Sequence, residues 1–142
     1  MPKVFIQAPA EQVFEAMCDL TRHAKWAKHD IAIESGQEGP PAVGNTYTSS
    51  HKGGSPDRLT ITEITLNERF GFHVVMANNW ELQQEMTVSS QGGDTLVTRS
   101  GKITKIPALM APLKLLGAIV GPMDDKKLLN NMKADLEGEA GS

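Results

Sequence analysis

Between about Asn45 and Ile106 the apolar residues recur at every second position, and this alternation constrains the fold more than any other feature. A period of two sends successive side chains to opposite faces of a β-strand, so each run predicts a strand with one apolar face. Short turns separate the runs, including Gly53-Gly54-Ser55-Pro56, Asn78-Asn79 and Gly92-Gly93-Asp94. Strands joined by turns this short pair mainly as an antiparallel meander, whose apolar face must be covered.

The alternation changes phase once, within the run from 58 to 66. Leu59 and Ile61 share one face, and the two apolar residues that follow them fall on the other. A slip of one residue moves every later side chain to the opposite face unless an extra residue is inserted. We therefore expect a β-bulge near Thr62-Glu63 and a strongly bent strand.

Helical spacing marks the segment before these strands. Pro9 suits a first helical position, and Lys3 to Gln7 in front of it has the pattern of a short strand. A second, shorter helix is expected from Thr21 to Lys28, with Trp26 as its one large apolar residue. The first helix is predicted by an apolar stripe at i, i+3, i+4 and i+7, formed by Ala10, Val13, Phe14 and Met17.

The end of the chain is also predicted to be helical, and it is the element able to cover the sheet. Two stripes, displaced in phase, meet at Gly121-Pro122, a pair that kinks or breaks helices. The first stripe has spacings of 4, 3, 4 and 3 and contains Leu109, Leu113, Leu116, Val120 and Met123. The second contains Leu128, Met132 and Leu136.

These elements fit one α+β domain over residues 1–142, because a chain of this length suits a single core. We expect a seven-stranded curved antiparallel sheet wrapped around a long C-terminal helix, with two short helices between the first two strands. A hydrophobic content of 39%, supplemented by 13 glycines, is typical of globular proteins. A bent sheet around one helix encloses either a filled core or a ligand cavity.

Composition excludes several classes of protein. No apolar run approaches the ~18 residues of a membrane span, so we expect no integral membrane association. With 14 basic and 17 acidic side chains, there is no electrostatic case for nucleic acid. Cys18 is the single cysteine and the first residues contain no apolar signal segment, so we expect a cytoplasmic protein. We expect a monomer or a weak homodimer.

The sequence lacks the motifs of common catalytic chemistries. His23 and His29 are six residues apart, a poor helical spacing for two ligands, so we expect no metal site and histidines that are solvated or hydrogen-bonded. Cys18 borders the apolar face of the first helix, which indicates a small packed thiol rather than an activated thiolate. No nucleophile elbow, phosphate loop or dinucleotide fingerprint is present, and we expect no cofactor.

The opening segment resembles a known family. The stretch Ile6-Gln7-Ala8-Pro9-Ala10-Glu11-Gln12-Val13-Phe14, then Asp19-Leu20 and Trp26, is similar to the start of the polyketide cyclase/dehydrase and lipid-transport family. That family belongs to the START-like, birch-pollen-allergen-like (SRPBCC) helix-grip superfamily. The resemblance covers roughly residues 3 to 137. Further similar segments are Gly44 to Tyr47, Arg58 to Phe72 with Thr62-Glu63 and Glu68-Arg69-Phe70, and Gly93-Asp94-Thr95.

The resemblance implies a helix-grip fold, in which a seven-stranded antiparallel sheet grips a long C-terminal helix around a hydrophobic pocket. Members include aromatic polyketide cyclases, lipid and sterol carriers, hormone receptors and ubiquinone-binding proteins. The shared motif sets the first strand and helix and contains no catalytic residue, so it implies a fold rather than an activity. One departure is Gly121-Pro122, which interrupts a helix that many members keep continuous.

Cyclase chemistry would need a pocket that fixes one conformer of a polyketone and a few donors that polarise carbonyls or move protons. Arg99 has two open placements, because the alternation from Thr95 to Ile103 is unclear. Facing inward beside Val97 it would be a functional hint, since a buried arginine is costly; facing outward it would pair with a carboxylate across the sheet. The catalytic candidates are Arg99, Gln84, His51 and Tyr47.

Candidate ligand-binding residues come from the expected inner face of the sheet and from the helices, although many of them are needed as plain core. The seven methionines, in a chain with only 5% aromatic residues, suit a deformable wall. The candidates are Trp26, Tyr47, Phe72, Val74, Met76, Trp80, Met86, Met110, Leu113, Leu116, Val120 and Met123.

Three hypotheses about function follow. The first is a binding module that holds a hydrophobic or amphipathic small molecule, such as a lipid, an isoprenoid or a polyketide-like compound, between sheet and C-terminal helix. The second is an enzyme of the polyketide cyclase/dehydrase type that closes or dehydrates a polyketone in that cavity. The third is an accessory interaction protein with a filled core.

Overall fold

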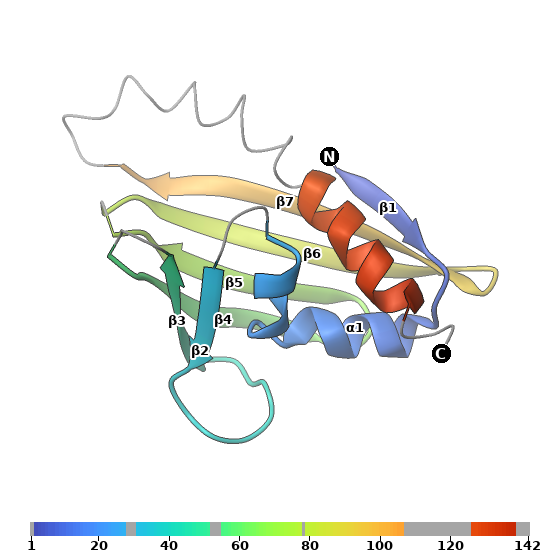
Figure 1. The fold of residues 1–142 in the computed structure, drawn as a ribbon, viewed down its shortest axis with the longest axis horizontal. Coiled ribbons are helices and arrows are strands. Elements are labelled where there is room, and N and C mark those ends of the chain that lie inside the picture. Colours follow the sequence, from blue (N-terminus) through green and yellow to red (C-terminus); the bar gives the residue numbers. More distant parts are fainter. Residues whose placement is uncertain (1, 28–30, 52–54, 78, 107–125, 139–142) are drawn as a thin grey trace.

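The computed structural model of the chain describes residues 2–27, 31–51, 55–77, 79–106 and 126–138 (Figure 1). These residues form an α+β structure with one seven-stranded sheet in the order β1-β7-β6-β5-β4-β3-β2. The strands are β1 (Lys3–Ile6), β2 (Ile31–Ser35), β3 (Thr46–His51), β4 (Asp57–Thr65), β5 (Arg69–Val75), β6 (Glu81–Gln91) and β7 (Asp94–Lys105). The helices are α1 (Ala10–Cys18), the 3-10 helix η1 (Arg22–Lys25) and a C-terminal helix at 126–138.

Every pair of neighbouring strands is antiparallel, which confirms the meander from β2 to β7. The last strand, β7, pairs with the first strand, β1, so β1 and β2 form the two edges of the sheet. The predicted bulge is also confirmed, because the pairing of β4 with β5 shifts between Ile61 and Glu63. The shift lets Leu59 and Ile61 before it, and Ile64 after it, all contribute to the core.

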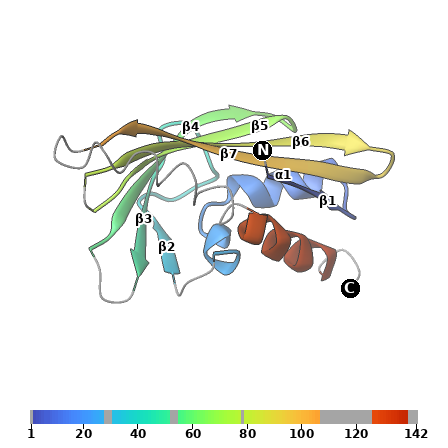
Figure 2. The same ribbon diagram turned by 90° about the horizontal axis from the view of Figure 1, so that it is seen from above.

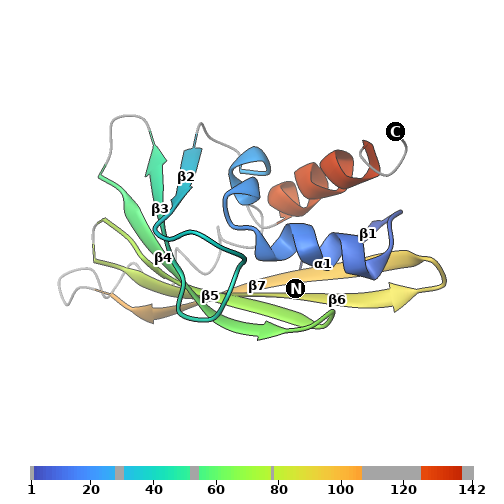
Figure 3. The ribbon, with the colours of Figure 1, turned by 90° about the horizontal axis from the view of Figure 1, so that it is seen from below.

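The helices lie on one face of the sheet, and β2 and β3 turn toward that side at one end (Figures 2 and 3). The face that carries the helices is therefore concave, in agreement with the expected curvature. The segment 107–125 lies outside the described residues. The first C-terminal stripe and the break expected at Gly121-Pro122 belong to this segment and therefore lie outside the description as well.

Two expectations about the helices need correction. The helix predicted over Thr21–Lys28 is a 3-10 helix of only four residues, Arg22–Lys25, held by bonds of the i to i+3 type such as Trp26 N to the His23 carbonyl at 3.0 Å. Pro9 is the N-cap of α1 rather than its first helical residue, because its ψ of 145° is extended. The predicted apolar stripe itself is correct: Val13, Phe14 and Met17 are buried.

The C-terminal helix is docked by both apolar and polar contacts. Its predicted stripe is shifted by one residue at the start, since Leu129 is fully buried and Leu128 only partly. Lys133 Nζ donates to the Phe5 carbonyl at 2.6 Å, and Glu137 accepts from the Gln7 N–H at 2.8 Å. The Phe5 carbonyl lies in the edge strand β1 and the Gln7 N–H directly follows it. These two bonds give hydrogen-bond partners to backbone groups that would otherwise lack a neighbouring strand.

No helix among the described residues combines the length and the apolarity required to cross a membrane.

Candidate functional site

A cavity of about 200 Å³ lies on the concave face, between η1, the C-terminal helix and the strands β2 to β7. Apolar side chains form most of its wall, as in many small-molecule sites. They are Leu20, Ala27, Ile31, Ile33, Leu59, Phe72, Val74, Met76, Leu82 and Leu128. The polar lining residues are His23, Ser49, Asp57, Gln84 and Arg99.

Arg99 faces inward, which decides between the two placements that the sequence left open. It follows Thr95 and Val97 on the buried side of β7, and only 8% of it is exposed. The guanidinium carbon lies 5.8 Å from the centre of the Phe72 ring, and Nη1 lies 3.5 Å from Met86 Sδ. A guanidinium above an aromatic face is a favourable cation–π arrangement, and it carries several N–H donors.

Gln84 also faces the cavity, from the middle of β6. Its strand partners are Phe72 on one side and Gly101 on the other. Gly101 leaves room for the amide, because a Cβ there would lie 2.8 Å from Gln84 Oε1. Among the described residues, Gln84 Oε1 is buried with no hydrogen-bond partner. A buried acceptor without a partner costs stability, so its presence calls for an explanation.

His23 is one of three polar lining residues that sequence reasoning missed, together with Ser49 and Asp57. It is 4% exposed, its Nε2 donates to the Met17 carbonyl at 2.7 Å, and its ring meets Phe72 edge-on at 5.9 Å. Burial first, and then the charge of Arg99, lower its pKa to about 3, against the opposing effects of the Met17 carbonyl and Asp19. His23 is therefore neutral. Its hydrogen bond agrees with the expectation of a hydrogen-bonded histidine, but the residue lies in the wall of the cavity.

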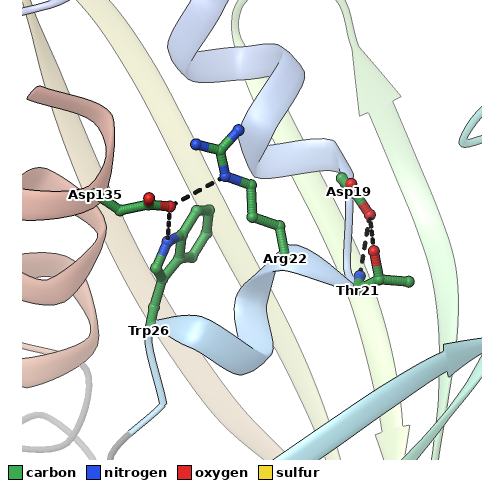
Figure 4. A network of polar contacts seen from close by, with 5 residues as sticks. All are labelled: Asp19, Thr21, Arg22, Trp26 and Asp135. Atoms are coloured by element: carbon green, nitrogen blue, oxygen red, sulfur yellow. Dashed lines mark hydrogen bonds and ion pairs between the residues drawn. The ribbon is translucent and has the colours of Figure 1, made fainter. Parts of the chain in front are cut away.

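The polar network in Figure 4 holds η1, and thus His23, in place. Asp135 of the C-terminal helix accepts from Trp26 Nε1 at 2.9 Å and from Arg22 Nε at 3.1 Å. Burial raises the pKa of Asp135, but the bonds from Trp26 and Arg22 outweigh it and lower the pKa overall. Asn131 adds a bond from its amide to the Trp26 carbonyl at 2.9 Å. The C-terminal helix and η1 are thus joined by three bonds to Asp135 and Asn131.

Only some of the predicted ligand-binding residues line the cavity. Phe72, Val74 and Met76 line the cavity. Trp26 and Met86 are fully buried but do not line it; Trp26 bonds to Asp135 and Met86 contacts Arg99. The remaining apolar candidates, Met110, Leu113, Leu116, Val120 and Met123, lie outside the described residues.

Trp80 is partly exposed in the turn before β6 and is not a lining residue of this cavity. His51 is the last residue of β3, opposite Ile31 of β2, and its side chain falls outside the description.

Tyr47 does not line the cavity but a second hollow, a groove of about 450 Å³ between α1, η1 and the segment joining β2 to β3. Polar residues border most of this groove, including Gln12, Glu15 and Asp19. Burial raises the pKa of Tyr47, so its hydroxyl remains protonated at neutral pH. The groove is larger than the cavity but has few apolar walls, and the cavity better matches the usual small-molecule site.

The polar side chains that line the cavity can bind a ligand and polarise it. Arg99 and Gln84 can hold oxygen atoms or hydroxyls, and His23 stays neutral. Burial raises the pKa of Cys18 to about 12, which confirms the packed thiol. No group of three or more potential metal ligands occurs in the described ranges.

Comparison with protein-family models and with curated proteins found no match, whereas solved structures share the fold. KanY matches with 18% identity and a TM-score of 0.67, over 95% of this chain and 94% of KanY. DynU16, a putative protein of the dynemicin biosynthetic locus, matches with 20% identity and a TM-score of 0.57, over 91% of this chain. This chain spans 45% of DynU16. The Aha1 dimer of Colwellia psychrerythraea matches with 19% identity and a TM-score of 0.57, over 95% of this chain and 92% of Aha1.

Proposed function

We propose that this protein belongs to the helix-grip superfamily and binds a hydrophobic or amphipathic small molecule in the cavity between the sheet and the helices. The observation that carries the proposal is the lining itself: mostly apolar walls with a few polar groups, among them the inward Arg99 and Gln84. A few polar groups placed in an apolar hollow orient a ligand, and burying such groups without hydrogen-bond partners costs free energy. The fold shared with DynU16 and KanY is consistent with this proposal.

The size of the cavity supports a compact ligand. Its volume of about 200 Å³ is smaller than the ~300 Å³ at which most small-molecule pockets begin. It is larger than the ~150 Å³ that suffices to hold one benzene molecule in a protein interior. A single ring or a short chain therefore fits within the described walls.

A cyclase or dehydrase activity is the second candidate, because the lining is not wholly apolar. A guanidinium can stabilise the enolate oxygen that forms when a polyketone closes, and a fixed pocket supplies proximity. Arg99→Ala separates this role from simple binding: a catalytic Arg99 loses turnover of a test polyketone while binding of the same compound persists.

Native mass spectrometry of the protein purified from its own host tests the binding proposal. We expect a bound small molecule that dissociates in the gas phase. The matched variants are Met76→Trp, which fills the rim of the cavity, and Val75→Trp, which adds the same ring on the opposite face of β5. Met76→Trp should lose the bound mass and Val75→Trp should keep it. Loss of the mass in both variants or in neither, or no bound mass in the parent protein, would leave the accessory protein with a filled core as the better account.

A further inference from the structure

The cavity places a hydrogen-bond acceptor beside a donor, and this pairing specifies the polar end of a ligand. Gln84 Oε1 supplies the acceptor, since it is buried and lacks a partner among the residues described. A ligand hydroxyl is the neutral donor that satisfies such an oxygen in an apolar pocket. Free protein bears the cost of the orphan oxygen, so binding a hydroxyl would recover it.

Arg99 supplies the donors, through a guanidinium that carries a full positive charge beside Phe72. The other basic side chain near it, His23, is neutral because of its low pKa, so the charge of this corner comes from Arg99. A guanidinium bonds most strongly to an anionic oxygen and also bonds to a carbonyl. The corner therefore favours a carboxylate, an enolate or a carbonyl oxygen.

The two groups are close enough to act on one head group. Gln84 lies opposite Gly101, and Arg99 is two residues from Gly101 on the same face of β7. Such diagonal neighbours on adjacent strands are about 7–8 Å apart at the backbone, within the reach of two long side chains that converge. The missing side chain at Gly101 lets the Gln84 amide lie against the backbone of β7, on the same face as Arg99.

Apolar side chains form most of the rest of the wall, whose other polar residues are His23, Ser49 and Asp57. Val74 and Leu82 are opposite each other on β5 and β6, and Leu59 pairs with Val74 from β4. An apolar ring or short chain placed here leaves its polar end toward Gln84 and Arg99.

We propose, on the basis of the function proposed above, that the ligand is a compact hydroxy acid or hydroxyketone. In it a hydroxyl that donates to Gln84 lies next to an acidic or carbonyl oxygen that accepts from Arg99.

A titration of the whole protein followed by NMR tests this inference with four related probes. They are 2-hydroxybenzoate with both groups, benzoate with the carboxylate, phenol with the hydroxyl, and toluene with neither. We expect 2-hydroxybenzoate to bind most tightly. Loss of the carboxylate should weaken binding roughly 10- to 100-fold, and loss of the hydroxyl about 2- to 10-fold.

Two variants assign each preference to its residue. Arg99→Met should abolish the preference for the carboxylate, so that 2-hydroxybenzoate and phenol bind with similar affinity, while Gln84→Met should abolish the preference for the hydroxyl. Lys102→Met is the control, because Lys102 is an exposed cation on the same strand. Toluene binding by each variant shows that its cavity is intact, and the probe series on the parent protein remains decisive if a variant fails to fold.

The outcomes separate this inference from the proposed function. If toluene binds as tightly as 2-hydroxybenzoate, the inference is wrong and the binding function stands. If Arg99→Met weakens toluene and 2-hydroxybenzoate equally, Arg99 only shapes the cavity, and the inference is also wrong. If none of the four probes binds and Met76→Trp leaves any bound mass unchanged, the proposed function itself fails.

Discussion

The concave face of the sheet has two halves that are filled in different ways. In the closed half, under α1 and the C-terminal helix, the side chains are apolar and almost wholly buried; they include Phe70, Met86, Val97, Met17, Met132 and Leu136. In the open half, between η1 and the strands β2 to β7, similar apolar residues border a cavity and are interrupted by polar ones: His23, Ser49, Asp57, Gln84 and Arg99. The burial of apolar area accounts for the packing of the side chains in the closed half.

The open half keeps groups that stability does not require. Burying the charged guanidinium of Arg99 costs free energy, and so does leaving the Gln84 amide oxygen without a partner among the described residues; a leucine at either position would cost less. Proteins retain buried polar groups that cost stability mainly at functional sites. The contrast within one sheet face is therefore the reason for placing function in the open half.

The largest expected effect tests the closed half. Leu136→Ala removes a fully buried side chain and should destabilise the protein by about 2–5 kcal/mol. Leu82→Ala, the matched change in the open half, removes a partly buried side chain beside an existing cavity and should cost only about 1 kcal/mol. Urea unfolding of the two variants measures the difference. Equal losses would show that the open half is packed as tightly as the closed one.

The second prediction concerns His23, which lies at the boundary between the halves. Its pKa falls to about 3 in the folded protein from an ordinary value near 6.5, so the unfolded chain binds a proton in that range while the folded one does not. Stability should thus be fully present above pH 6.5 and decrease by about 1 kcal/mol per pH unit as the pH falls toward 3. His23→Gln should remove this slope, as measured by unfolding at several pH values. An unchanged slope in the variant would mean that His23 is protonated in the folded state.

The third prediction concerns the link between the C-terminal helix and η1. Asp135→Asn weakens the bonds from Arg22 and Trp26 and should destabilise the protein by about 1–2 kcal/mol at neutral pH. Because the pKa of Asp135 is lowered on folding, its contribution is present above the ordinary carboxyl pKa and is lost as the pH falls below it. Thermal unfolding at pH 7 and at pH 3 should therefore separate parent and variant at pH 7 more than at pH 3. If parent and variant differ in stability by the same amount at pH 7 and at pH 3, the charge of Asp135 does not contribute to its bonds with Arg22 and Trp26.

The smallest effect is expected at Gln84. Gln84→Met removes the buried oxygen that lacks a partner while keeping a side chain of similar shape. The free protein should gain up to about 1 kcal/mol in stability, in contrast to almost every other inward substitution. Thr87→Met on the opposite face of β6 provides a comparison, since it removes a hydroxyl that is hydrogen-bonded to Thr98. A loss of stability in Gln84→Met as large as that in Thr87→Met would show that Gln84 is a satisfied structural residue.

The sheet could be predicted from the sequence because its signals are local. Turn residues and alternation fixed the antiparallel strands, and the change of phase after Ile61 was sufficient to place the bulge. The buried face of β5 was predicted for the same reason.

The candidate site could be predicted only in part, because its contacts join segments far apart in the sequence. Arg99 and Thr95 are polar residues on the buried side of β7, and they hide the alternation that would have placed them. His23 gains its neighbours Phe72 and Met17 only when η1 packs against the sheet. One signal was available: His23 and Trp26 are three residues apart, which puts both on one side of a single helical turn.

The most direct test of the central claim is to locate a bound apolar probe by nuclear Overhauser effects between toluene and the methyl groups of the protein. Binding in the open half predicts contacts to Leu59, Val74 and Leu82 and none to Val13 or Leu136 of the closed half. Contacts confined to the closed half, or to the groove beside Tyr47, would contradict the account.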